Sequence, residues 1–277
     1  MHLVPKQEVL QMKRMVAILI AGAAFSAASY AQTNTVSSAN IVGYVQTQTP
    51  SSNSFDIISL VQFSDGSDSV NIQSAIANLS NLTASTTWSN ADKLIIWNGG
   101  YVTFGLYKPS SGNPYWMASG AGWSIPAFAK QATNQLERGK GVWFQAGANS
   151  HGTNMIVSGD VFLDNTFDVN LVGTLTLLAY PYSSDINLTN MVISNATAAA
   201  TWVNADKLVI WNGGYVSYGL YQPTSGNPYW MASGAGWSIP AFAKPTTNVT
   251  INLGKGFWYQ SVSGAKTIRF NKIYSVN

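Results

Sequence analysis

Apolar and polar residues alternate in short runs along the chain, and turn-forming residues interrupt these runs about every 8 to 12 positions. This pattern, rich in β-branched and aromatic residues, predicts short antiparallel strands rather than helices. The clearest predicted element is a hairpin in which strands Lys93–Trp97 and Tyr101–Tyr107 flank Asn98-Gly99-Gly100. Glycine supplies the positive φ that such a tight turn needs. The second strand has one apolar face, which we expect in the core, and one tyrosine-rich face.

The same hairpin returns later in the chain, because residues 88–130 recur at 202–244 with only six differences. The differing pairs are Ser89/Val203, Ile95/Val209, Thr103/Ser217, Phe104/Tyr218, Lys108/Gln222 and Ser110/Thr224. The tryptophans also form matched pairs: Trp88/Trp202, Trp97/Trp211, Trp116/Trp230, Trp123/Trp237 and Trp143/Trp258. The chain is therefore a tandem duplication of one module.

Further strands are predicted on both sides of the repeated block. In the first copy they are Ile41–Gln46, Asp56–Phe63, Tyr115–Met117, Val142–Ala146 and Met155–Val157. In the second copy they are Asp160–Leu163, Leu171–Ala179, Tyr229–Met231, Phe257–Ser261 and Thr267–Phe270. The segments Ser69–Leu82 and Asp185–Ser194 are compatible with a short helix instead. The sequence thus predicts an all-β fold of two tandem antiparallel modules, each a β-sandwich or a partly open barrel.

The first 31 residues have the pattern of a secretory signal peptide. A basic start at Met12-Lys13-Arg14 precedes an apolar run and the small residues of Ser29-Tyr30-Ala31, so we expect cleavage after Ala31, with Met12 as an alternative start. We then expect β modules at residues 32–157 and 158–277, closely abutting because no Pro- or Gly-rich linker separates them. The expected location is outside the cell or on the outer surface of a bacterium, with the periplasm as an alternative.

Composition narrows the classes of partner. Without residues 1–31 the chain keeps 11 basic and 10 acidic residues, which does not provide the basic surface that nucleic acids require. No later segment is long and apolar enough for a membrane span, so none is expected in the mature chain. The chain has no cysteine, so each module must be held together by burial alone.

Short motifs resemble those of a known group of exported proteins. They are Val42-Gly43-Tyr44-Val45 near the start, Trp97-Asn98-Gly99-Gly100-Tyr101 in the hairpin and Gly139-Lys140-Gly141 before an aromatic strand, with Gly254-Lys255-Gly256 in the second copy. The chain resembles an uncharacterised family of exported β-rich proteins of Verrucomicrobia-type bacteria and, more loosely, surface modules of the Bacteroidetes. The resemblance implies export and a β-rich module, without implying a chemistry. From the residues themselves, each Gly-Lys-Gly predicts a turn into a strand and not a phosphate loop.

Groups suited to catalysis or metal binding are scarce in the sequence. The only histidine after residue 31 is His151, and the repeated block contains one carboxylate per copy, Asp92 or Asp206. Nucleophilic triads, zinc sites and glycoside hydrolysis need several converging groups. We expect both aspartates to accept backbone hydrogen bonds. Oxygen ligands for calcium could come from Asp65, Asp68, Asp160, Asp164 and Asp168, but these residues lack the regular spacing of a calcium-binding loop. The prediction is a non-enzymatic protein without a cofactor or a metal.

Aromatic side chains carry the positive hypothesis. The segment 107–123 is a loop rich in Gly, Ser, Pro and Asn that contains several rings, and exposed rings stack on the apolar faces of sugars. Packing that pins the loop onto the sheet is the alternative, and we expect Trp97 and Trp143 in the core. The candidate ligand-binding residues are Trp116, Trp123, Tyr107, Tyr115 and Asn113, with Trp230, Trp237, Tyr221, Tyr229 and Asn227 in the second copy.

Three functions are compatible with these features. The first is an exported surface or matrix protein, such as an adhesin, that acts by contact and binds an extracellular polysaccharide through the duplicated aromatic loops, where two sites would add avidity. The second is a structural subunit that self-associates into a fibre or envelope layer through strand edges at Ile41–Gln46 and Thr267–Tyr274. A polysaccharide-degrading enzyme is the third and is disfavoured.

Overall fold

The computed structural model describes residues 42–60, 67–74, 81–120, 123, 130–150, 154–234, 236–237 and 244–273. Almost every regular element in these residues is a β-strand, and none of the sheets they form closes into a barrel. The predicted all-β fold is confirmed, and of the two predicted architectures the sandwich agrees with these sheets. No helix in the described part of the chain has the length and apolar character that a membrane crossing requires.

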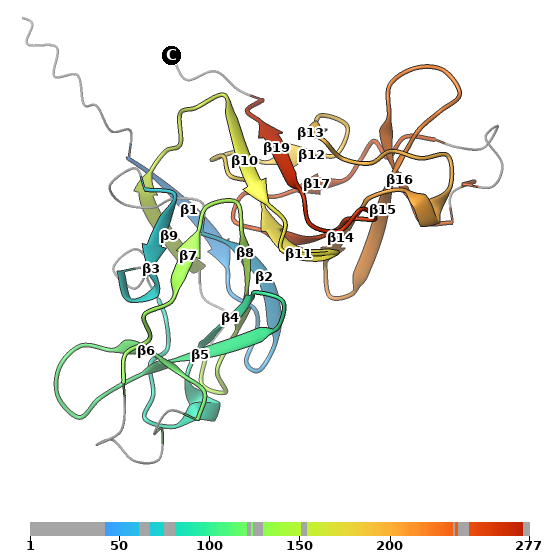
Figure 1. Ribbon diagram of the computed structural model, residues 1–277. Helices are drawn as coiled ribbons and strands as arrows, with labels where there is room; N and C mark the ends of the chain where they lie inside the picture. The colour runs from blue at the N-terminus through green and yellow to red at the C-terminus, as the bar shows by residue number, and fades with distance from the viewer. Residues whose placement is uncertain are drawn as a thin grey trace, which may run out of the picture. The chain divides into compact units, whose positions relative to one another are not determined.

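The first module is built around a five-stranded antiparallel sheet, drawn from blue to green in Figure 1. Its strand order is β2-β8-β4-β5-β6, and two small sheets, β1-β9 and β3-β7, accompany it. The bounds are β1 (Val42–Gln48), β2 (Phe55–Ser59), β3 (Ser69–Asn71), β4 (Lys93–Trp97), β5 (Tyr101–Tyr107), β6 (Tyr115–Ala118), β7 (Gln135–Glu137), β8 (Gly141–Gln145) and β9 (Asn154–Asp160), with a single 3₁₀ turn, η2, at Trp88–Asn90.

The second module repeats this arrangement in yellow to red (Figure 1). Its five-stranded sheet has the order β11-β18-β14-β15-β16, and its smaller sheets are β10-β19-β13 and β12-β17. The bounds are β10 (Thr166–Asn170), β11 (Leu175–Ala179), β12 (Ile186–Asn187), β13 (Ile193–Ser194), β14 (Lys207–Trp211), β15 (Tyr215–Tyr221), β16 (Tyr229–Ala232), β17 (Thr250–Ile251), β18 (Gly256–Gln260) and β19 (Thr267–Asn271), and η4 spans Trp202–Asn204.

Each module has its own core of apolar side chains between its sheets. In the first module the strands β4, β5 and β8 contribute Leu94, Phe104 and Phe144, and β9 contributes Met155 and Val157 from the smaller sheet. The equivalent core of the second module includes aromatic residues of both sheets, namely Tyr218, Trp230, Phe257, Tyr259 and Phe270. Burial of large side chains from two facing sheets therefore stabilises each module without disulfides.

The predicted hairpin is confirmed in both copies. Trp97 pairs with Tyr101 and Trp211 with Tyr215, and the turn glycine Gly99 has a φ of +73°, which explains the choice of glycine. The boundary expected near Ser158 falls within β9, which runs on to Asp160.

Two details of the sequence-based prediction are wrong. The strand expected at Asp160–Leu163 is instead β10, because residues 161–164 connect β9 to it. The segment Asp185–Ser194 is not a helix, since it contains β12, a turn and β13. In the first copy, residues 72–74 are helical, and residues 75–80 lie outside the described part of the chain. The expected signal peptide and Ile41 also lie outside it.

Candidate functional site

The two modules contact each other through reciprocal hydrogen bonds from one pair of equivalent tryptophans. The Trp97 indole at the end of β4 donates to the Leu175 carbonyl at 2.9 Å, and the Trp211 indole at the end of β14 donates to the Phe55 carbonyl at 3.2 Å. Phe55 and Leu175 are the first residues of β2 and β11. Such reciprocity is the property of a two-fold, isologous interface, realised here within one chain.

The same indoles form the centre of this junction. Trp97 meets Trp258 edge-on with ring centroids 5.4 Å apart, and Trp211 meets Trp143 in the same way at 5.5 Å. Ile57 and Leu177 complete this buried cluster between the modules. Of the two tryptophans expected in the core, Trp143 is buried, as is its twin Trp258, whereas Trp97 is only partly buried. The cluster to which they belong is shared by both modules.

The two Gly-Lys-Gly turns also face the junction. The Gly139 carbonyl accepts from the Ala179 N–H at 3.0 Å, and the Gly254 carbonyl accepts from the Ser59 N–H at 2.8 Å. A Cβ at Gly141 would lie 2.6 Å from the Leu178 carbonyl oxygen of the other module. The motif is a turn into a strand, as predicted, and the close approach of the other module explains why the residue after the lysine is glycine.

An aromatic groove opens beside the junction. It has a volume of about 490 Å³ and is lined by Phe55, Ile95, Tyr101, Thr103, Trp143, Trp211 and Tyr215. The two tyrosines occupy equivalent positions at the start of β5 and β15 and are 60% and 58% exposed. Burial of the ring raises the pKa of Tyr101, and the neighbouring phenol of Tyr215 raises it further. The Tyr101 hydroxyl is therefore a neutral hydrogen-bonding group at physiological pH.

A second hollow, the polar groove, shares Phe55 and Trp211 with the aromatic groove. Its volume is about 750 Å³, and its polar lining includes Asp56, Asn212, Asn248, Asn252 and Lys255. Lys255 forms an ion pair with Asp56 across the junction. The two grooves together place flat rings next to amides, a carboxylate and an ammonium group.

The predicted binding tryptophans of the loop are mostly in the interior. Trp116 is 0% exposed and Trp230 is 3% exposed, so neither ring offers a face on the surface. Trp123 packs edge-on against Trp88 and Tyr107, with ring centroids 4.9 Å and 5.2 Å away, and a Cβ at Gly105 would lie 2.7 Å from its ring. The packing of these rings agrees with the alternative prediction, in which they pin the loop onto the sheet.

The remaining candidates of the loop are divided between interior and surface. Tyr107 and Tyr221 are buried, their partners Tyr115 and Tyr229 are half-buried at ring distances of 5.4 Å, and Trp237 is buried over Gly219. Only Asn113 and Asn227 are exposed. Alternation along a strand did not reveal this, because it tells which residues share a face but not which loop covers the face.

The repeated aspartates are structural acceptors, as expected. Asp92 is buried and accepts the Thr83 N–H at 2.7 Å and the Gly147 N–H at 2.8 Å. Burial raises the pKa of Asp92, and its hydrogen bonds offset this effect only in part. Such a carboxylate ties three segments of the first module together.

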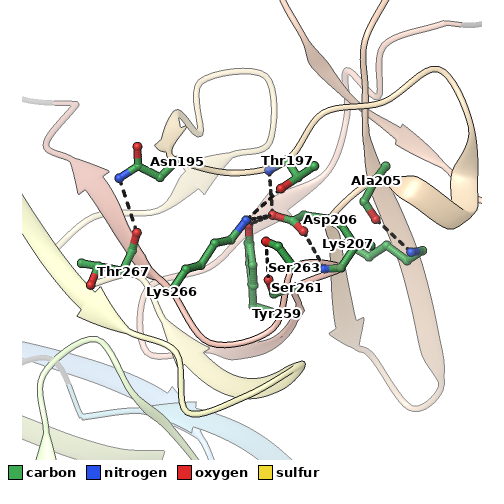
Figure 2. Close-up of polar contacts among 11 residues, drawn as sticks. Asn195, Thr197, Ala205, Asp206, Lys207, Tyr259, Ser261, Ser263, Lys266 and Thr267 are labelled. Atoms are coloured by element: carbon green, nitrogen blue, oxygen red, sulfur yellow. Dashed lines mark hydrogen bonds and ion pairs between the residues drawn. The ribbon is translucent and has the colours of Figure 1, made fainter.

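Asp206 has additional partners, which converge on it in Figure 2. Its carboxylate accepts the Thr197 N–H at 2.7 Å and the Val262 N–H at 2.8 Å, as well as the Tyr259 hydroxyl at 2.7 Å and the Lys266 ammonium at 2.6 Å. Burial acts to raise the pKa of Asp206, but these bonds, led by that from Lys266, outweigh it and lower the pKa. The first module has Phe144 in place of the tyrosine, which explains part of the difference between the copies.

No metal centre is formed by the described residues, because no three His, Cys, Asp or Glu side chains among them are placed to hold an ion. Asp168 instead pairs with Arg269, and Asp68 with Arg138. Asp65 and His151 lie outside the described part of the chain.

Comparison with known protein families, with curated proteins and with solved structures found no match for this chain. The functional argument therefore depends on the geometry of the molecule itself.

Proposed function

We propose that this protein is an exported, non-enzymatic surface or matrix component that acts by contact, and that it binds a carbohydrate in the aromatic and polar grooves at the junction. The observation that carries the proposal is the pair of half-exposed tyrosines, Tyr101 and Tyr215, next to Phe55 and Trp211. Aromatic faces of this kind stack on the apolar C–H faces of sugar rings.

The chemistry of the polar groove supports the same ligand class. Asn212, Asn248 and Asn252 supply amide donors and acceptors for sugar hydroxyls, and Asp56 and Lys255 add charged hydrogen-bonding groups. Volumes of about 490 Å³ and 750 Å³ lie within the range of small-molecule sites, which is roughly 300 to 1,000 Å³. The aromatic groove also has the predominantly apolar walls that are typical of such sites.

A site at the junction gives the near-identity of the two hairpins a physical reason. The aromatic groove takes Tyr101 and Trp143 from the first module and Trp211 and Tyr215 from the second. Both hairpins must then keep the shape that fits the other module and the ligand. The proposal differs from the loop-based prediction in having one composite site rather than one site per loop.

The test is a glycan array probed with the purified protein and with the double variant Tyr101→Ala/Tyr215→Ala. Both rings are largely exposed, so the variant is expected to fold, which circular dichroism checks. Loss of two stacking rings is expected to weaken binding roughly tenfold or more. Tyr44→Ala is the matched control, because Tyr44 is 71% exposed and lies on β1, away from the groove lining. Wild-type protein that binds no glycan, or a folded double variant that binds as well as wild type, refutes the proposal.

Self-assembly remains a second candidate because of one observation at β1. Among the described strands, β1 pairs only with β9, so none of them occupies its other edge, which is where the sequence suggested pairing between chains at Ile41–Gln46. The other predicted edge is wrong for residues 267–271, because β19 lies between β10 and β13. Electron microscopy and size-exclusion chromatography at high protein concentration separate the candidates, since a strictly monomeric protein excludes assembly.

A further inference from the structure

A glutamine side chain caps the outer edge of the first module's main sheet. Gln73 accepts the Trp116 N–H on Oε1 at 2.9 Å, and its Nε2 donates to the Trp116 carbonyl at 2.7 Å and to the Ala132 carbonyl at 2.9 Å. Its carboxamide thus takes the place that a neighbouring strand would have beside β6. All three bonds of this cap use backbone groups of the first module.

The second module has a threonine at the equivalent position. Gln73 and Thr189 both donate their backbone N–H to an asparagine two residues earlier, Asn71 or Asn187, at 2.9 Å. The Thr189 hydroxyl bonds to the same Asn187 side chain at 2.8 Å, so it is directed away from β16. Threonine is also too short to provide the three contacts that Gln73 makes.

The backbone groups that Gln73 would reach are nevertheless retained in the second module. Trp230 is the twin of Trp116, and its carbonyl accepts the Thr246 N–H at 2.9 Å, just as the Trp116 carbonyl accepts the Ala132 N–H at 2.8 Å. Leu220 on β15 is paired with Trp230 on β16, but its N–H donates to the Asp206 carbonyl on the other side of β15. Leu220 and Trp230 therefore form a pair without hydrogen bonds between them, and the Trp230 N–H points outward from the sheet. Within the described residues, neither this N–H nor the Thr246 carbonyl has a hydrogen-bond partner.

These groups lie along a side groove of about 450 Å³. Its walls are mainly apolar and include Leu188, Met191, Ile193, Leu220, Trp230 and Thr246. Trp230 is only 3% exposed, and an unpaired buried N–H is costly, so a bound acceptor gains more here than on an open surface.

We propose that the side groove binds the primary carboxamide of a glutamine or asparagine side chain presented by a partner polypeptide. A primary amide has one N–H on the same side as its carbonyl oxygen, so it can accept from the Trp230 N–H and donate to the Trp230 carbonyl together. Its second N–H then reaches the Thr246 carbonyl, as Gln73 does with Ala132. A trans secondary amide, including a peptide bond or the acetamido group of a sugar, has its N–H on the opposite side and cannot form this pair. The apolar walls accommodate the methylene stem of the side chain.

The probe is N-acetyl-glutamine-N-methylamide, whose only primary amide is the side chain. We expect it to shift the backbone amide signal of Trp230 in ¹⁵N–¹H spectra, with a dissociation constant on the order of 1 mM for so small a ligand. The matched glutamate probe and a probe methylated on the side-chain nitrogen should leave the signal in place. A Trp230 signal that glutamine does not move, or that all probes move equally, overturns the proposal.

A variant of the protein provides the second test. Thr189→Gln introduces the side chain of the first module, so it should occupy the site, abolish the response to the glutamine probe and raise Tm. Thr189→Ser, which keeps the short hydroxyl, should respond as wild type does. A folded Thr189→Gln protein that still responds to the probe contradicts the proposal. If the variant does not fold, the comparison of the glutamine probe with its methylated form on the wild-type protein is the deciding test. Neither test uses the junction grooves, so the outcome is independent of glycan binding.

Discussion

Replacing Gly141 by alanine is expected to destabilise the protein through the junction between the modules. The added Cβ would lie 2.6 Å from the Leu178 carbonyl oxygen and 3.2 Å from the Leu177 side chain. Because the closest atom belongs to the backbone of the other module, the clash is relieved only when the modules move apart. Overpacking of this kind typically costs about 1 to 3 kcal/mol.

The second turn gives a related variant with a different expectation. A Cβ at Gly256 would lie 2.6 Å from the Ile57 side chain and 2.9 Å from the same Leu178 carbonyl. The nearest backbone atom is thus farther from this Cβ than the 2.6 Å found for Gly141, so Gly256→Ala should cost less than Gly141→Ala. Since the two substitutions crowd one carbonyl, the double variant should lose less stability than the sum of the single losses.

Urea unfolding followed by tryptophan fluorescence measures these differences, because the indoles of the junction change environment when the modules separate. Gly100→Ala is the matched control, since a Cβ there would have nothing within 4 Å. If Gly141→Ala changes the free energy of unfolding by no more than the control, the modules do not meet through Gly141 and Leu178 in solution.

Three further predictions concern the interior of the modules. Trp116→Ala should cost about 3 to 5 kcal/mol, because the ring is fully buried, and thermal unfolding should show a large fall in Tm. Gly219→Ala should also be destabilising, because its Cβ would lie 2.7 Å from the Trp237 ring, and increased quenching of tryptophan fluorescence by iodide would report release of that ring. Because Asp206 has a lowered pKa in the fold, it contributes stability above the unfolded value of 3.8 that is lost as the pH falls through the folded pKa. Urea unfolding between about pH 2 and pH 6 should therefore show that the free energy of unfolding falls less on acidification in Asp206→Asn than in the wild-type protein. Asp92 has a raised pKa, so its contribution is largest at low pH and declines as the pH rises through the folded value, and Asp92→Asn should not reduce the acid-induced loss.

The interior of each module could be anticipated in part from the residues. The hairpin, the turn glycines and the role of Asp92 as a backbone acceptor follow from local rules that apply over a few positions. The placement of Trp116 did not follow, because Gly- and Pro-rich loops occur both on surfaces and pinned onto sheets. The backbone of Trp116 is held by hydrogen bonds from Gln73 and Ala132, which are distant in sequence.

The aromatic groove was harder to anticipate, and the signals for it were indirect. The tyrosine-rich face of the hairpin was the one feature of the sequence that included Tyr101 and Tyr215, although neither was among the candidate residues, and the repeated Gly-Lys-Gly predicted only a turn into a strand. Phe55 carried no such signal, because it lies outside the repeated block. Its role at the groove exists only because the other module brings Trp211 to its carbonyl.

The amino-acid sequence by itself determined that this chain is a duplicated β protein without disulfides, because periodicity, turn residues and repetition are local properties of the chain. The tertiary structure decided which repeated residues face each other. Trp97 and Trp211 reach across the junction, Asp206 gains Lys266, and Thr189 bonds to Asn187 where Gln73 bonds to the strand edge. These differences arise from contacts between segments far apart in the sequence, where the divergent residues outside the repeated block give two nearly identical hairpins different surroundings.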